Sequence, residues 1–170
     1  MRTAVLALLL VGAAIAVSGQ SSDSKLQAQL KQIFPSATGF SPKEGQPPHF
    51  KAYAGGQTIA GYAFWTTELE PLERAYDGPI KILVGMDTKG VLAGIIVVDH
   101  HEPYGNFSID PPQFAAQFKG KNIRDPFKVG SDIDAVSRAS ISITSATRAI
   151  RNSARRIARA FLTPPEAGGK

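Results

Sequence analysis

The sequence predicts an α+β domain in which helices pack on an antiparallel sheet, and two segments carry this prediction. In residues 80–98, two apolar runs rich in β-branched side chains flank Asp87-Thr88-Lys89-Gly90, where glycine allows the positive φ of a tight turn. Near the C-terminus, apolar side chains recur at helical spacing on one arc, and arginines recur on a neighbouring arc. The apolar arc holds Ile143, Ala146, Ile150, Ala154, Ile157 and Phe161. We therefore expect a β-hairpin and a long amphipathic C-terminal helix that packs on the sheet.

Residues 1–19 are predicted to be an export signal peptide. Arg2 precedes an apolar run of about 14 residues, whereas a membrane span needs about 20, and small residues follow at Ser18 and Gly19. An uncleaved anchor in the membrane interface is the alternative. The chain has no cysteine, which excludes disulfides and thiolate metal sites and suits a bacterial periplasm. We expect an exported, periplasmic protein whose mature chain has no transmembrane span.

The remainder of the chain is expected to form one domain without an internal linker. Residues 20–79 supply an N-terminal helix, predicted at 20–34, and the first strands, and residues 80–165 supply the core. The first two strands, FKAYA and TIAGYAFWTT, flank the turn Gly55-Gly56-Gln57. Residues 166–170 are expected to form a disordered tail.

Polar connections separate the remaining elements. A polar connection from Glu68 to Gly78 leads into the hairpin. The polar loop DHHEPYGNF follows the hairpin. The segment PPQFAAQFKG predicts a short helix that proline starts and Gly120 ends.

Basic charge is concentrated in the C-terminal helix. The net charge is +5, and six arginines but no acidic residues lie between residues 135 and 165. A nucleic-acid binder more often spreads basic residues over several elements of one face, so we do not expect nucleic-acid binding. The arginine arc is either a solvated face or a docking surface for an acidic redox partner or anionic lipid headgroups. It holds Arg148, Arg151, Arg155 and Arg159.

Five hydroxyl side chains gather where the last helix begins: Ser137, Ser140, Ser142, Thr144 and Ser145. Serine or threonine at a helix start commonly caps free backbone N–H groups. The same N–H groups, together with the partial positive charge of a helix start, also suit a phosphate. From the residues alone, capping is the more common role and anion binding is the alternative.

The segment Asp134-Ala135-Val136-Ser137-Arg138-Ala139-Ser140, followed by Thr144-Ser145, resembles the flavin-attachment motif of the FMN-binding domain family. This domain occurs in flavin subunits of Rnf and sodium-pumping NADH:quinone reductase complexes, and in the periplasmic domain of NosR-type membrane regulators. The family pattern is aspartate, two residues, Ser or Thr, Gly, Ala, then Thr or Ser. A separate flavin transferase joins FMN to the last hydroxyl through a phosphoester. The resemblance, strongest to the NosR type, covers about residues 30–162. It implies FMN as cofactor, Ser140 as its attachment residue and residues 80–165 as the FMN-binding core.

Physical reasoning beside the resemblance gives candidate roles to the other residues of the motif. Asp134 orients the turn or binds the metal of the transferase; otherwise it accepts hydrogen bonds from nearby N–H groups. Arg138 replaces the usual glycine, and it pairs with the phosphate or is solvated. Ser140 replaces the usual threonine and forms the same ester, with non-covalent FMN as the alternative. Ser137, Ala139, Ser142 and Thr144 complete the candidate contacts in this segment.

The loop after the hairpin is the second candidate part of the site. The resemblance places Glu102-Pro103-Tyr104-Gly105 near the flavin ring, where Tyr104 stacks on it and Gly105 lets the backbone approach closely. His101 is a further candidate for binding the cofactor. Ordinary packing is the alternative role of Tyr104. We do not expect a metal site at the His100-His101 pair, because adjacent strand residues point to opposite faces.

Together these observations predict an exported periplasmic flavoprotein that carries electrons on FMN. No substrate-handling residues are evident beyond the flavin site, so an electron carrier is favoured over an enzyme with its own substrate. Its partners would be a flavin transferase and a periplasmic or membrane redox protein. The alternative is an accessory module of the same fold that docks a redox or maturation partner without tightly bound flavin.

Overall fold

The computed structural model describes residues 17–162 and confirms the α+β fold. Most of the predicted signal peptide, residues 1–16, and the predicted disordered tail lie outside the described residues. Five strands form one antiparallel sheet in which each strand pairs with its neighbour in sequence. They are β1 (Gly39–Phe40), β2 (Phe50–Tyr53), β3 (Ile59–Trp65), β4 (Lys81–Asp87) and β5 (Leu92–Asp99).

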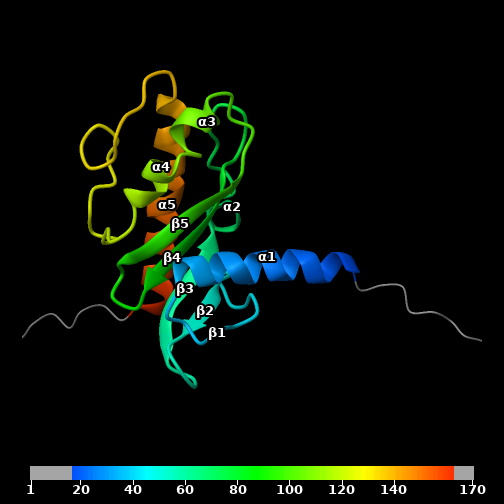
Figure 1. The fold of residues 1–170 in the computed structure, drawn as a ribbon. Helices are drawn as coiled ribbons and strands as arrows, with labels where there is room; N and C mark the ends of the chain where they lie inside the picture. The colour runs from blue at the N-terminus through cyan, green and yellow to red at the C-terminus, as the bar shows by residue number, and fades with distance from the viewer. Residues whose placement is uncertain (1–16, 163–170) are drawn as a thin grey trace, which may run out of the picture.

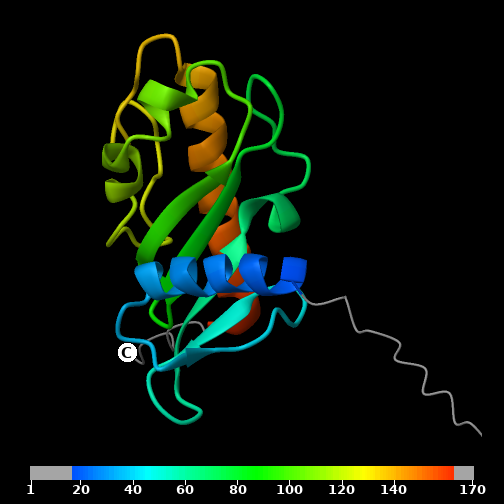
Figure 2. The ribbon, with the colours of Figure 1, turned by 45° about the vertical axis from the view of Figure 1, so that its right-hand side comes forward.

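Two helices cover opposite faces of the sheet (Figure 1). α1 (Val17–Ile33) crosses one face, and α5 (Ser140–Phe161) runs along the other. Figure 2 shows the same arrangement after rotation, with the strands between α1 in blue and α5 in orange and red. Within residues 17–162, no helix is both long enough and apolar enough to cross a membrane.

The alternation of side chains along the strands produces two apolar cores. Val84 joins the cluster that contains Ile143 and Ile150 of α5, whereas its neighbour Leu83 joins the cluster that contains Leu30 of α1. This follows because successive residues of a strand point to opposite faces. All six apolar positions predicted for the last helix pack in or against the α5 cluster, so the predicted arc is confirmed.

Three short helices connect these elements: α2 (Thr66–Leu69), α3 (Gly105–Ser108) and α4 (Pro112–Ala116). The strand predicted to continue through residue 67 is too long, because the chain turns into α2 at Thr66. The buried hydroxyl of Thr66 donates to the carbonyl of Ile80 at 3.1 Å and accepts from the amide of Ile82 at 3.0 Å, which fixes that turn. The helix predicted over residues 111–120 forms only as the five residues of α4.

The long connection between α4 and α5 is ordered by Asp132. Its carboxylate accepts hydrogen bonds from the amides of Lys128 and Phe127 and from Nζ of Lys121. Partial burial raises the pKa of Asp132, but these three donors together lower it more, so the pKa lies below its ordinary value. This anchored connection delivers residues 134–139 to the start of α5.

A pair of glycines in the hairpin tests how closely α1 packs on the sheet. Gly85 of β4 lies opposite Gly94 of β5 on the same face of the sheet, but only at Gly85 would a Cβ meet side chains of α1 and the residue that follows it. A Cβ at Gly85 would lie 2.2 Å from Cγ2 of Ile33 and 2.8 Å from Cε2 of Phe34. We expect Gly85→Ala to lower the free energy of unfolding by about 1–3 kcal/mol, measured by urea denaturation.

Gly94→Ala is the matched control, because a Cβ there would meet nothing within 4 Å. Its free energy of unfolding should stay the same or rise by about 0.5 kcal/mol. Equal losses in the two variants would contradict the close contact between α1 and β4.

Candidate functional site

A cavity of about 430 Å³ opens at the N-terminal end of α5. Its volume lies within the range of about 300–1,000 Å³ that is usual for small-molecule sites. Three segments that are distant in sequence form its walls: the connection after α2, the loop after β5, and the start of α5. The lining residues are Tyr76, Pro103, Tyr104, Arg138, Ser140, Ile141 and Ser142.

The first turn of α5 presents free backbone N–H groups to this cavity. The residue at the N-cap is Ala139, which has no side chain able to cap, and the regular ladder begins with the amide of Ile143 bonded to the carbonyl of Ala139. The favoured prediction that the hydroxyls cap this helix is therefore wrong. Uncapped N–H groups and the positive end of the helix dipole remain, and both favour an anion.

The five hydroxyls at the helix start separate into two groups. Ser142 and Ser145 are buried, and they donate to the carboxylates of Glu102 and Glu73. Ser137, Ser140 and Thr144 are exposed and make no hydrogen bond to the described residues. Of the exposed group, only Ser140 lines the cavity, so it alone is placed to react with a ligand there.

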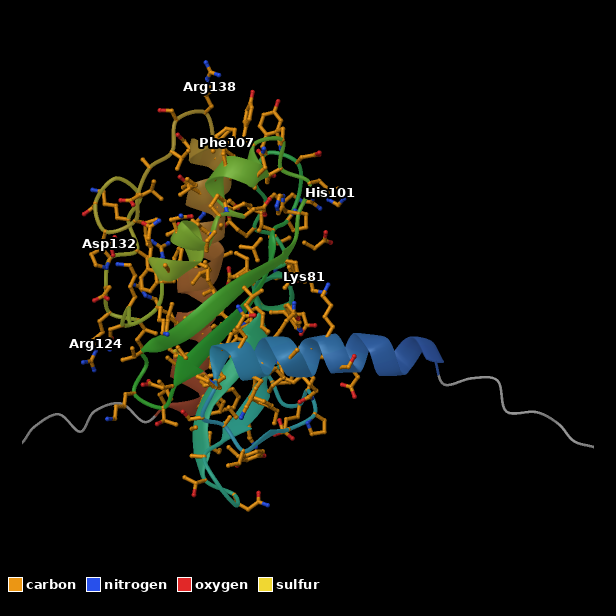
Figure 3. The ribbon with its side chains drawn as sticks, in the orientation of Figure 1. Lys81, His101, Phe107, Arg124, Asp132 and Arg138 are labelled. Atoms are coloured by element: carbon orange, nitrogen blue, oxygen red, sulfur yellow. The ribbon has the colours of Figure 1, made fainter. Side chains whose placement is uncertain are left out.

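Arg138 lines the same cavity in an unusual backbone conformation. Its φ is 69°, in the left-handed region that costs a residue with a side chain about 1–2 kcal/mol. Glycine adopts this conformation freely, which explains the glycine at this place in the family pattern. The guanidinium is exposed and forms no ion pair with the described residues. It stands at the end of the molecule where α5 begins (Figure 3).

The carboxylate of Glu102 lies beneath the cavity and joins its three walls. Its side chain is buried, with 6% of the residue exposed. Oε1 accepts from the amide of Asp77 at 2.8 Å, and Oε2 accepts from the amide of Tyr76 at 3.2 Å and from the hydroxyl of Ser142. A buried carboxylate needs such donors, because desolvation without them is costly.

The residues of this site coincide with a known domain. The sequence model of the FMN-binding domain family matches residues 75–155, a range that contains every residue lining the cavity. Residues 75–155 belong to the FMN-binding domain family. FMN is therefore the cofactor of this domain.

Known relatives share this domain within longer chains. Regulatory protein NosR of Pseudomonas aeruginosa is 29% identical over 162 residues, which cover 89% of this chain and 22% of the relative. A subunit of the ion-translocating oxidoreductase complex of Yersinia pestis is 28% identical over 150 residues, which cover 81% of this chain and 67% of the relative. The chain thus spans about a fifth of that NosR protein and two thirds of that oxidoreductase subunit.

The cavity of the FMN-binding domain has the two environments that FMN requires. The free amides of α5 and the guanidinium of Arg138 suit a phosphate. Tyr104, 43% exposed, and Ile141, 56% exposed, provide apolar surface for an aromatic ring. The ring of Tyr104 also lies against Phe107, with centroids 5.4 Å apart. On these contacts the chemistry of the site fits the cofactor.

Three residues of the loop after β5 that were expected at the cavity do not line it: His101, Glu102 and Gly105. His101 is exposed and lies away from Arg138 and Phe107 in Figure 3. Gly105 is buried against His100, where a Cβ would come within 2.1 Å of the ring. The structure thus explains Gly105 by close packing on His100. His100 in turn accepts from the amide of Glu102 at Nδ1 and contacts Asp110 through Nε2 at 2.7 Å.

Asp134 opens on a neighbouring cavity of about 450 Å³, which Phe107 and Gln117 also line. The amide of Asp134 donates to Oε1 of Gln117 at 2.7 Å, but its carboxylate accepts no hydrogen bond from the described residues. The alternative role of this carboxylate, as an acceptor for nearby N–H groups, therefore has no partner among the described residues. The two ends of the motif, Asp134 and Ser140, face different hollows.

The arginine arc is not uniformly free for docking. Arg148 pairs with Glu73 at 2.8 Å, and Arg155 donates to the carbonyls of Ile123 and Asp125. Nε of Arg151 lies 3.2 Å from the side-chain oxygen of its neighbour Asn152, and Arg159 is exposed. Much of this charge therefore ties α5 to other segments.

Sequence reasoning missed Tyr76 and Ile141 among the lining residues, and it missed Glu73 as a partner of α5. Tyr76 and Glu73 lie in a polar connection without periodicity, and Ser145 and Glu73 are 72 residues apart. Only Ile141 carries a weak signal in the sequence, because it is an apolar residue that directly follows the motif.

The backbone of Arg138 supplies a stability test of the site. Arg138→Gly should be more stable to urea denaturation than Arg138→Ala by about 1 kcal/mol, because only glycine takes φ 69° without steric conflict. Equal stability of the two variants would show that this residue is not held in the left-handed conformation.

Proposed function

We propose that this protein is an exported, periplasmic electron-transfer flavoprotein that carries FMN through a phosphoester to Ser140. One observation carries the proposal: the exposed hydroxyl of Ser140 opens on a cavity at the uncapped start of α5. Export rests on the signal-like sequence of residues 1–19. The electron-transfer role is supported by the family match and by a relative named as a subunit of an oxidoreductase complex.

Different residues of the cavity bind the phosphate and the ring of FMN. The amides of α5 and the guanidinium of Arg138 bind and orient the phosphate at Ser140. Tyr76, Tyr104 and Ile141 pack against the ring and exclude water from its surface. When bound, FMN supplies the capacity to accept and return electrons. The protein therefore needs no nucleophile or metal ligand of its own for this chemistry.

Attachment requires a flavin transferase as a partner. The bond formed joins Oγ of Ser140 to the phosphorus of FMN, and the bond broken is the P–O bond of the phosphoanhydride in a flavin dinucleotide bound to the transferase. The nucleoside monophosphate leaves with the electron pair of that bond, and the hydroxyl proton leaves to a base. Ser140 suits this step because it is exposed and its hydroxyl makes no competing hydrogen bond to the described residues. The second partner is a periplasmic or membrane redox protein that exchanges electrons with the loaded domain.

Intact mass tests the attachment residue. After export in a host that contains the flavin transferase, the wild-type protein should gain the mass of one FMN less one water, and Ser140→Ala should not. Ser137→Ala is the matched control, because Ser137 is an exposed serine of the same turn that does not line the cavity. Loss of the adduct in Ser137→Ala alone would move the attachment site, and no adduct in any variant would favour the accessory module.

Non-covalent binding tests the phosphate contacts. In the Ser140→Ala background we expect FMN to bind more tightly than riboflavin, because only FMN carries the phosphate. Adding Arg138→Ala should weaken FMN binding about tenfold or more and leave riboflavin unchanged, measured by fluorescence titration. Arg124→Ala is the control, since Arg124 is exposed far from the cavity (Figure 3). A similar loss for riboflavin would contradict the phosphate role.

A further inference from the structure

The connection between α2 and β4 carries one wall of the cavity. Tyr76 stands on it with 70% of its surface exposed, yet it lines the cavity beside Ser140. Apart from a local bridge between Ala75 and Gly78, residues 74–79 have no regular structure. An exposed ring on such a segment keeps its position only where the backbone is tied to the rest of the fold.

Two carboxylates provide these ties. Glu73 accepts from the hydroxyl of Ser145 at 2.9 Å and from Nε of Arg148 at 2.8 Å, which fixes the connection to the middle of α5. Glu102 accepts from the amides of Tyr76 and Asp77 themselves. Glu102 therefore holds the backbone of the residue whose ring covers the cavity.

Hydrogen bonds of both its backbone and its side chain hold Glu102 in place. Its amide donates to Nδ1 of His100 at 3.0 Å, and its carbonyl accepts from the amide of Gly105 at 3.1 Å. Its carboxylate also accepts from Ser142, the third residue of α5. A single buried side chain thus spans the loop after β5, the Tyr76 connection and the helix that carries Ser140.

We propose that Glu102 is a positioning residue of the FMN site: it sets the spacing between the Tyr76 connection and the start of α5, and so places Tyr76 over the cavity at Ser140. This rests on the proposed function. The carboxylate makes all its hydrogen bonds to cavity walls and is not part of either apolar core. Its loss therefore acts on the shape of the cavity more than on the stability of the sheet.

The test begins without flavin, on the exported full chain. In Glu102→Gln, one carboxylate oxygen becomes an NH₂ group that cannot accept, so one of the amides of Tyr76 and Asp77, which donate to different oxygens, loses its acceptor and the other keeps only an uncharged one. Hydrogen exchange at one or both of these amides, followed by NMR, should accelerate at least about tenfold, while exchange in β3 and β4 stays unchanged. Ser142→Ala is the control, because it removes the contact to α5 and leaves both amide bonds in place. Unchanged exchange at Tyr76 and Asp77 would overturn the proposal.

The second half of the test adds FMN in the Ser140→Ala background. Glu102→Gln should weaken FMN binding and increase the fluorescence of the bound flavin, because a displaced tyrosine ring no longer stacks on it. Tyr76→Ala should reproduce the fluorescence change with both amides still protected, so the test survives even if Glu102→Gln folds poorly. Faster exchange with unaltered flavin fluorescence would also overturn the positioning role. If the Ser140→Ala variant with Glu102 intact binds no FMN, the proposed function is refuted instead. The hydrogen-exchange data, collected without flavin, then show separately whether Glu102 holds the amides of Tyr76 and Asp77.

Discussion

The packing of α5 along one face of the sheet is the constraint on which the rest of the structure depends. Its apolar side is buried from Ile143 to Ile157, so the helix cannot slide or turn without exposing several aliphatic side chains. This fixed position brings the first turn of α5 beside the loop that leaves β5. Backbone N–H groups that need an acceptor are thereby placed at a cavity, where they favour an anion.

The polar contacts beneath the cavity follow from that placement. Ser142 and Ser145 lie on the buried side of α5, where a hydroxyl without a partner would be costly. Glu102 and Glu73 satisfy them, and the same two carboxylates hold the connection that carries Tyr76. The hydroxyls that cluster in this part of the sequence therefore have two tasks: the buried ones join α5 to the cavity walls, and Ser140 remains free.

The sequence predicts those parts whose signal is local and repeated. The β4–β5 hairpin has two apolar runs and a turn glycine, and α5 has six apolar positions at helical spacing, so both were predictable. β1 and α2 contain two and four residues, too few for any period to appear. The roles of Glu102 and Glu73 depend on partners 40 and 72 residues away, and no local pattern encodes such contacts. The arginines of α5 illustrate the same limit, since Arg155 and Arg159 share an arc but only Arg155 meets carbonyls of another segment.

Arg138 shows how site chemistry can override backbone preference. At φ 69° a glycine would be free of strain, and the family pattern has glycine there. An arginine at this place costs stability and makes no ion pair with the described residues that would offset the cost. Arg138 instead lines the cavity beside Ser140, where the free amides of α5 already favour an anion, and its exposed guanidinium extends from that end of the molecule (Figure 3). The strained backbone thus belongs to a residue that brings a permanent positive charge to the edge of the cavity, near the position proposed for the phosphate of FMN. Such a charge would hold the nucleotide in place before any covalent bond is made.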